Sequence, residues 1–170
     1  MAITYEPIAT NTVSGTGTAS VTFSSIPSTY TDLILICNTG IISGTDNLGI
    51  RVGNGSVDTG SNYSITYLTG NGTSASSARL SSQTILEITY VGGMDSTLNS
   101  NQIVQFNDYS NTTTNKTLVT RNNRASLGVD AAVGLWRSTS AINIITCTVK
   151  GGTSNWLSGS TFTLYGIKEA

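Results

Sequence analysis

Residues 118–122 read Leu-Val-Thr-Arg-Asn, and their side chains fall into two alternating sets with a period of two. Successive side chains of a β-strand point to opposite faces of a sheet, so this period indicates a strand and not a helix. The same period governs residues 102–107, where Ile103 and Gln105 alternate with Val104. These two neighbouring segments therefore predict a β-protein.

Further segments support this prediction, because they are short, apolar and rich in β-branched or aromatic residues. Thr, which fits a pleated sheet better than a helix, is the commonest residue. Gly and Asn, which favour tight turns, separate the segments, as in Asn54-Gly55 and Asn71-Gly72. The best helix candidates, residues 74–82 and 130–136, are short and irregular. The expected strands are 3–9, 19–25, 32–41, 48–52, 63–69, 84–91, 101–109, 116–122, 131–137, 141–150 and 161–168.

This pattern of short strands separated by turns predicts an all-β chain with little or no helix, folded as one antiparallel, jelly-roll-like β-sandwich domain over residues 1–170. No linker, charge run or fixed repeat marks a domain boundary. Cys37 and Cys147 lie in apolar segments and are expected to be small buried side chains, with a bridge between strands as the alternative.

Composition excludes several classes of function. The 170 residues contain no His, and only 10% are charged, against roughly 25% in soluble domains. Without His, neither a Ser-His-Asp triad nor a His-ligated metal site can form. The formal charge of −1 and the lack of a basic cluster argue against nucleic acid. No apolar run is long enough to cross a bilayer, and the first ten residues do not resemble a secretory signal.

Few acidic residues are candidates for chemistry, and we expect no enzyme activity, no cofactor and no metal. Glu87 interrupts an apolar segment and is expected to face solvent or to pair with an Arg across the sheet. The loop aspartates show no calcium-binding spacing and are expected to make turn hydrogen bonds.

Three residues are candidates for contact with a partner. Arg121 and Arg124 form the one local pair of arginines, and Arg is favoured at interfaces. Trp156 lies in a polar loop before the last strand, where partial exposure would permit subunit contact or stacking on a sugar. Loop packing is the plainer interpretation of Trp156, and Trp136 is expected in the core.

Two segments are more specific than composition: residues 19–36, which contain Phe23-Ser-Ser-Ile-Pro-Ser-Thr-Tyr-Thr-Asp-Leu33, and the end Phe162-Thr-Leu-Tyr-Gly-Ile-Lys168. Together with the start, residues 3–9, they resemble small virion structural proteins of tailed bacteriophages. The residues themselves indicate an apolar hook around Pro27, and at Gly166 a bulge or a close backbone approach.

The resemblance implies a structural component of the virion, assembled in the host cytoplasm. The first expectation is a capsid decoration (cement) protein, a homotrimer bound to the major capsid protein or another virion protein. The alternative is a tail-fibre or tail-tip module that binds a host-surface glycan. Neither nucleic acid nor a membrane is an expected partner.

Overall fold

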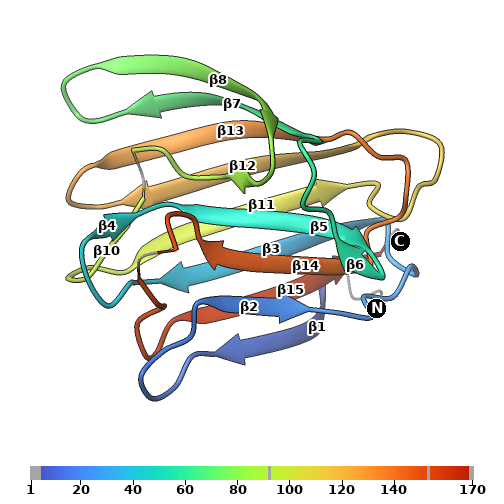
Figure 1. The fold of residues 1–170 in the computed structure, drawn as a ribbon, viewed down its shortest axis with the longest axis horizontal. Coiled ribbons are helices and arrows are strands. Elements are labelled where there is room, and N and C mark those ends of the chain that lie inside the picture. The colour runs from blue at the N-terminus through green and yellow to red at the C-terminus, as the bar shows by residue number, and fades with distance from the viewer. Residues whose placement is uncertain (1–4, 92, 153, 169–170) are drawn as a thin grey trace.

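A computed structural model describes residues 5–91, 93–152 and 154–168, and these fold into two facing antiparallel sheets (Figure 1). The larger sheet has eight strands in the order β1–β15–β3–β11–β12–β13–β7–β8. The smaller has the order β2–β14–β5–β6, with β9 also paired to β5. No helix occurs in the described ranges, so the expected antiparallel β-sandwich is confirmed.

The strand bounds are as follows. The larger sheet contains β1 (Tyr5–Thr12), β15 (Thr161–Ile167), β3 (Asp32–Thr39), β11 (Ser100–Asn107), β12 (Lys116–Arg124), β13 (Gly128–Trp136), β7 (Tyr63–Gly70) and β8 (Ala75–Gln83). The smaller contains β2 (Ser20–Phe23), β14 (Ile144–Val149), β5 (Leu48–Asn54), β6 (Ser56–Val57) and β9 (Leu86–Glu87). A separate short pair joins β4 (Thr45–Asp46) to β10 (Met94–Asp95).

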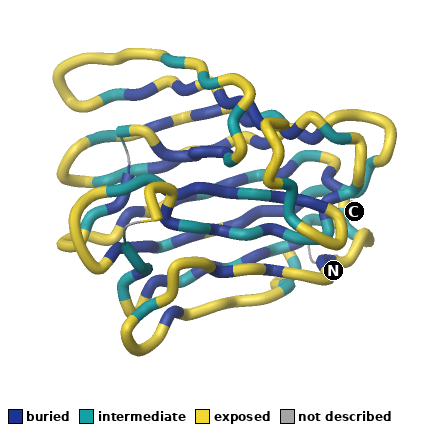
Figure 2. Tube along the Cα trace, in the orientation of Figure 1, coloured by how far each residue is buried: buried dark blue, intermediate teal, exposed yellow. Residues whose placement is uncertain are grey.

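The core lies between the sheets, and buried residues alternate with more exposed ones along the inner strands β11, β12 and β13 (Figure 2). On β12 the buried set is Leu118, Thr120 and Asn122, whereas Val119 and Arg121 are exposed, so the alternation predicted from residues 118–122 is confirmed. Apolar side chains of the smaller sheet pack against this inner face. Removing this apolar surface from water is the main driving force for folding.

Strand β15 shows why the C-terminal segment is apolar on both faces. It lies between β1 and β3, so its backbone is hydrogen-bonded on both sides. Phe162, Leu164 and Gly166 are buried on the inner face, and Tyr165 on the other face is half-buried. The segment is therefore an inner strand of the larger sheet and not an edge strand.

Two strand predictions are wrong. Residues 75–83, which overlap the helix candidate 74–82 and were not among the expected strands, form the edge strand β8 paired to β7. Its Ser-rich sequence lacks a strong alternation, because an edge strand with little buried surface needs few apolar side chains. Residues 84–91 were expected as one long strand, but only Leu86–Glu87 pairs with β5, and the chain then leaves the sheet.

Candidate functional site

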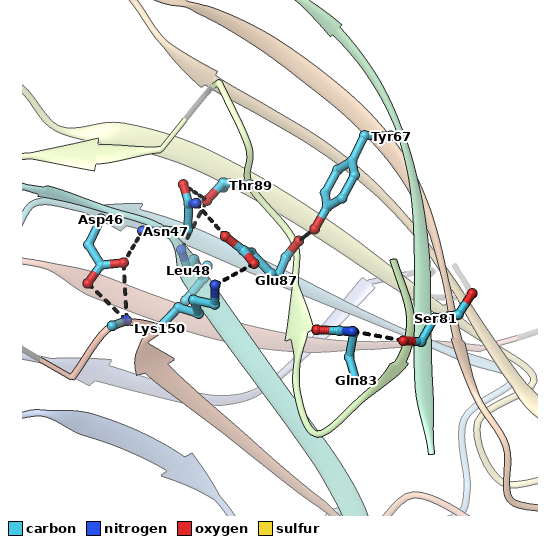
Figure 3. Close-up of polar contacts among 10 residues, drawn as sticks. Asp46, Asn47, Leu48, Tyr67, Ser81, Gln83, Glu87, Thr89 and Lys150 are labelled. Atoms are coloured by element: carbon cyan, nitrogen blue, oxygen red, sulfur yellow. Dashed lines mark hydrogen bonds and ion pairs between the residues drawn. The ribbon is translucent and has the colours of Figure 1, made fainter. Parts of the chain in front are cut away.

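The carboxylate that interrupts an apolar segment, Glu87, is buried within a partly exposed polar cluster between the smaller sheet and its neighbouring loops (Figure 3). Its Oε2 pairs with Lys150 Nζ at 2.9 Å, and its Oε1 accepts a hydrogen bond from Asn47 Nδ2 at 2.6 Å. Tyr67 donates its hydroxyl proton to the Glu87 carbonyl oxygen, and burial raises the pKa of Tyr67. Glu87 was expected to face solvent or to pair with an Arg; it is instead buried and pairs with a Lys.

The second carboxylate of this cluster also has a structural role. Asp46 Oδ1 accepts the Asn47 N–H at 2.7 Å, and Asp46 Oδ2 accepts the Gly151 N–H at 2.9 Å. Thr89 Oγ1 accepts the Leu48 N–H and donates to Asn47 Oδ1, which ties the segment after β9 to the start of β5. Because the Lys150 ammonium and several N–H donors bind the two carboxylates, this cluster holds the surrounding loops together.

A larger unusual feature is the outer face of the eight-stranded sheet, defined here as the side chains that point away from the smaller sheet. Six large apolar side chains on it are 40–62% exposed: Tyr5, Ile36, Leu68, Val119, Val129 and Val133. With about 200 Å² for a fully exposed Tyr and about 120 Å² for a fully exposed Val, Leu or Ile, they present on the order of 400 Å² of apolar surface. That area is typical of the largest apolar patch of a monomer, and such patches often mark interaction sites.

Strand register places several apolar side chains of this face directly beside one another. Val119 of β12 lies directly opposite Val133 of β13, and Ile103 of β11 lies opposite Ile36 of β3. A shallow hollow of about 380 Å³ crosses the same face, and its lining includes Tyr5, Ile34, Ile103, Gln105, Val119, Arg121 and Ala131. An aromatic ring, an amide and a guanidinium therefore surround an otherwise aliphatic floor.

The outer face carries few charges. Its strands present two exposed arginines, Arg79 and Arg121, and one partly buried carboxylate, Asp32. Asp32 is already engaged, because it accepts hydrogen bonds from Gln105 Nε2 at 3.2 Å and from the Asp108 N–H at 2.8 Å. Within the described residues no ion pair involves Arg79 or Arg121. The face is therefore apolar with a positive bias.

The three predicted contact residues are not brought together. Arg121 is exposed on the outer face, but Arg124 is three positions further along the same strand and points to the opposite side. The Arg124 side chain is only 11% exposed and lies 3.9 Å from Asp95 (Nε to Oδ2). Trp156 is fully buried and packs edge-on against Phe162, with ring centroids 5.0 Å apart, so the plainer interpretation, loop packing, is confirmed and the exposure needed for partner contact is absent. Trp136 is in the core, as predicted.

Sequence reasoning missed most of the outer face because it did not separate the two faces of each strand. The signal was present. In residues 129–135, Val129, Ala131, Val133 and Leu135 occupy every second position. Leu118 and Val119 are adjacent and both apolar, although neighbouring residues of a strand point to opposite faces. Apolar residues on both faces of neighbouring strands indicate a sheet that is covered on both sides. In the larger sheet, however, only the inner face is covered, and the outer face is open.

The segments that carry the sequence resemblance meet in space. β1, β15 and β3 are adjacent in the larger sheet, although they come from the two ends of the chain (Figure 1). The Tyr30 ring lies against Gly166, and Lys168 Nζ lies 5.5 Å from the centre of that ring and 2.9 Å from Glu6 Oε1. The close backbone approach predicted at Gly166 is thus confirmed. The paired motifs have a structural explanation, because each supplies one half of this contact.

No metal centre or membrane span is found in the part of the chain that the structure describes. Nowhere in it do three or more Cys, Asp or Glu side chains gather as a metal site requires. Nor does it contain a helix long and apolar enough to cross a bilayer. A scan against models of known protein families finds no match, and a search of curated proteins finds no relative.

Proposed function

We propose that this protein is a structural component of a tailed-bacteriophage virion, a decoration protein that binds the outer surface of the head and stabilises its lattice. Two observations support the proposal. The segments at both ends of the chain resemble such virion proteins, and the outer face of the larger sheet offers an open apolar surface. The outer face is the main support for the proposal, because folding of the single chain does not require an exposed apolar surface.

The size of the outer face suits protein binding. Eight strands about 4.8 Å apart, each about seven residues long at about 3.3 Å per residue, span on the order of 900 Å². A specific protein–protein interface buries about 800 Å² on each partner, so one face of this sheet is large enough for a complete interface.

The positive charges on the outer face favour a partner other than a second copy of this chain. A two-fold contact centred on the hollow would place the exposed Arg121 of both copies in one interface, and like charges at an interface oppose binding. A partner surface with apolar and acidic side chains would instead complement Arg79 and Arg121. The proposed occupant is therefore the major capsid protein, presenting such a surface on the exterior of the head.

The mechanism is thermodynamic and makes or breaks no covalent bond. A protein that binds the assembled shell but not its separated subunits stabilises the shell by mass action. We propose that the chain does this as a homotrimer, since closed rings of identical subunits suit the symmetry axes of a lattice. Its site of action is the virion, assembled in the host cytoplasm.

A binding assay on heads tests this proposal. Val133 lies on the outer face of β13, opposite Val119, and is 55% exposed, so Val133→Asp places a charge in the proposed interface with little effect on the core. Leu98, 46% exposed in the loop before β11, offers a matched control, Leu98→Asp. On heads that lack this protein, Val133→Asp should bind at least tenfold more weakly than the wild type, and Leu98→Asp should bind normally. Equal binding by all three proteins would overturn the proposed contact.

The alternative, a tail-fibre or tail-tip module that binds a glycan, is favoured by one observation. The hollow on the outer face places Tyr5, Gln105 and Arg121 together, and an aromatic ring beside polar donors is the chemistry that sugars require. Under this alternative the protein would not bind heads. It would bind host-surface polysaccharide, and Tyr5→Ala would abolish that binding.

A further inference from the structure

The two cysteines of the chain, 110 positions apart in the sequence, meet inside the folded core. Cys37 lies on the inner face of β3 in the larger sheet, and Cys147 lies in β14 of the smaller sheet. Neither side chain is accessible to solvent, and both thiols are free. Both residues belong to one core cluster, and the Cys147 thiol is the titratable neighbour of the Cys37 thiol.

Their surroundings hold both residues in place. In the larger sheet Cys37 lies opposite Phe162 on one side and Gln102 on the other. In the smaller sheet Cys147 lies between Val21 and Ile50. Each cysteine is thus in an inner strand of its sheet, with paired strands on both sides, so neither can move away from the other without disturbing the core. A disulfide that joins the two sheets through the core is a known feature of β-sandwiches.

We propose that Cys37 and Cys147 are a redox-sensitive pair, reduced in the host cytoplasm and joined as an inter-sheet disulfide when the chain folds in the presence of a small-molecule disulfide such as oxidised glutathione. The inference does not depend on the proposed capsid contact, because it concerns the interior and not the outer face.

The exchange reaction balances as follows. The thiolate of one cysteine attacks a sulfur of the small disulfide, which forms a mixed disulfide and releases one small thiolate. The thiolate of the second cysteine then attacks the protein sulfur of the mixed disulfide, which forms the Cys37–Cys147 bond and releases the second small thiolate. The two cysteine protons end on the two released thiols. Two electrons pass from the cysteine pair to the small disulfide.

Burial decides when this reaction is fast. Loss of solvent, followed by the contact with Cys147, raises the pKa of the Cys37 thiol well above its ordinary value. The reactive thiolate is therefore scarce in the folded protein, and the glutathione molecule cannot reach it. Oxidation should be slow for the native protein and fast during folding, before the two sheets close over the pair.

The bond would constrain the unfolded chain strongly, because it closes a loop of more than one hundred residues. For a protein of this size the entropic stabilisation corresponds to a rise in Tm of about 10 °C. Reduction of the denatured protein would remove the whole of this increment.

The experiment refolds the denatured wild type in a mixture of reduced and oxidised glutathione, with a parallel sample in excess reductant. Intact mass spectrometry and thiol titration in denaturant then count free thiols, and thermal unfolding gives Tm. The expected result is a monomeric chain about 2 Da lighter, with no free thiol and a Tm about 10 °C higher than the reduced sample. The control, Cys147→Ala, should show no intramolecular bridge and no difference in Tm between the two samples.

Three results would overturn the proposal. The first is a wild type that refolds in oxidised glutathione to a native protein with two free thiols. The second is a disulfide found only between different chains. The third is an intramolecular bridge that lowers Tm, because the bond would then not fit the folded sandwich. All three use the wild-type chain, so a poorly folding variant cannot obscure the outcome.

Discussion

The contact between Tyr30 and Gly166 gives the sharpest test of how the two ends of the chain hold together. A Cβ added at Gly166 would lie within 2.5 Å of three carbons of the Tyr30 ring, whereas ordinary contact between carbons needs about 3.5–4.0 Å. The φ of Gly166 is not in the left-handed region, so the backbone itself accepts alanine. The cost of Gly166→Ala therefore comes from displacing the ring by about 1 Å.

Overpacking of this kind costs about 1–3 kcal/mol in the free energy of unfolding. We expect about 2–3 kcal/mol here, because the added Cβ meets the Cγ and Cδ atoms of the Tyr30 ring and not the far end of a flexible side chain. For a domain of this size that loss lowers Tm by about 5–10 °C. Urea unfolding followed by tryptophan fluorescence, together with thermal unfolding, measures both quantities.

Gly70→Ala is the matched control, since its new Cβ would meet only Val129 Cγ2 at 3.8 Å, an ordinary contact within a strand of the same sheet. Gly70→Ala should change the free energy of unfolding by less than about 0.5 kcal/mol. In a Tyr30→Ala background, Gly166→Ala should lose most of its cost. The reasoning is refuted if Gly166→Ala is as mild as Gly70→Ala, or if its cost persists without the Tyr30 ring.

Three further predictions concern other parts of the molecule. The N–H groups of Leu98 and Thr97 lower the pKa of Asp95 below its ordinary value of 3.8, so Asp95 contributes stability above pH 3.8 that is lost as pH falls through the lowered value. Asp95→Asn should therefore cost about 1 kcal/mol near pH 7 and progressively less below pH 3.8 in urea titrations; a cost independent of pH would contradict this. Trp136 and Trp156 are 4% and 0% exposed, so iodide should barely quench the native fluorescence, and strong quenching would place a ring at the surface. Size-exclusion chromatography with light scattering should give a trimer, against which a monomer at micromolar concentration would count.

The fold class could be predicted from the sequence because the period of two survives in β11 and β12 even where the residues are polar. The close approach at Gly166 could be predicted too, since a glycine inside an apolar strand is typical of a bulge or of a place where another part of the protein comes near the backbone. Edge strand β8 could not, because its Ser-rich sequence carries little periodicity and its pairing with β7 is decided by the tertiary fold.

The candidate site was harder to predict, because it depends on which strands become neighbours. Arg121 and Arg124 are close in the sequence, yet the strand sends them to opposite sides, and only Arg121 reaches the outer face. Val119 and Val133 come from different strands, and their juxtaposition requires the β12–β13 register. The Cys37–Cys147 contact likewise requires the packing of one sheet on the other.

Electron microscopy of the intact particle tests the central claim most directly, namely that the outer face of the larger sheet docks on the phage head. The account predicts hundreds of copies on the head, with Val119, Arg121 and Val133 against the major capsid protein and the smaller sheet toward solvent. Copies confined to the tail, or head-bound copies that turn the smaller sheet to the shell and leave the outer face in solvent, would contradict it.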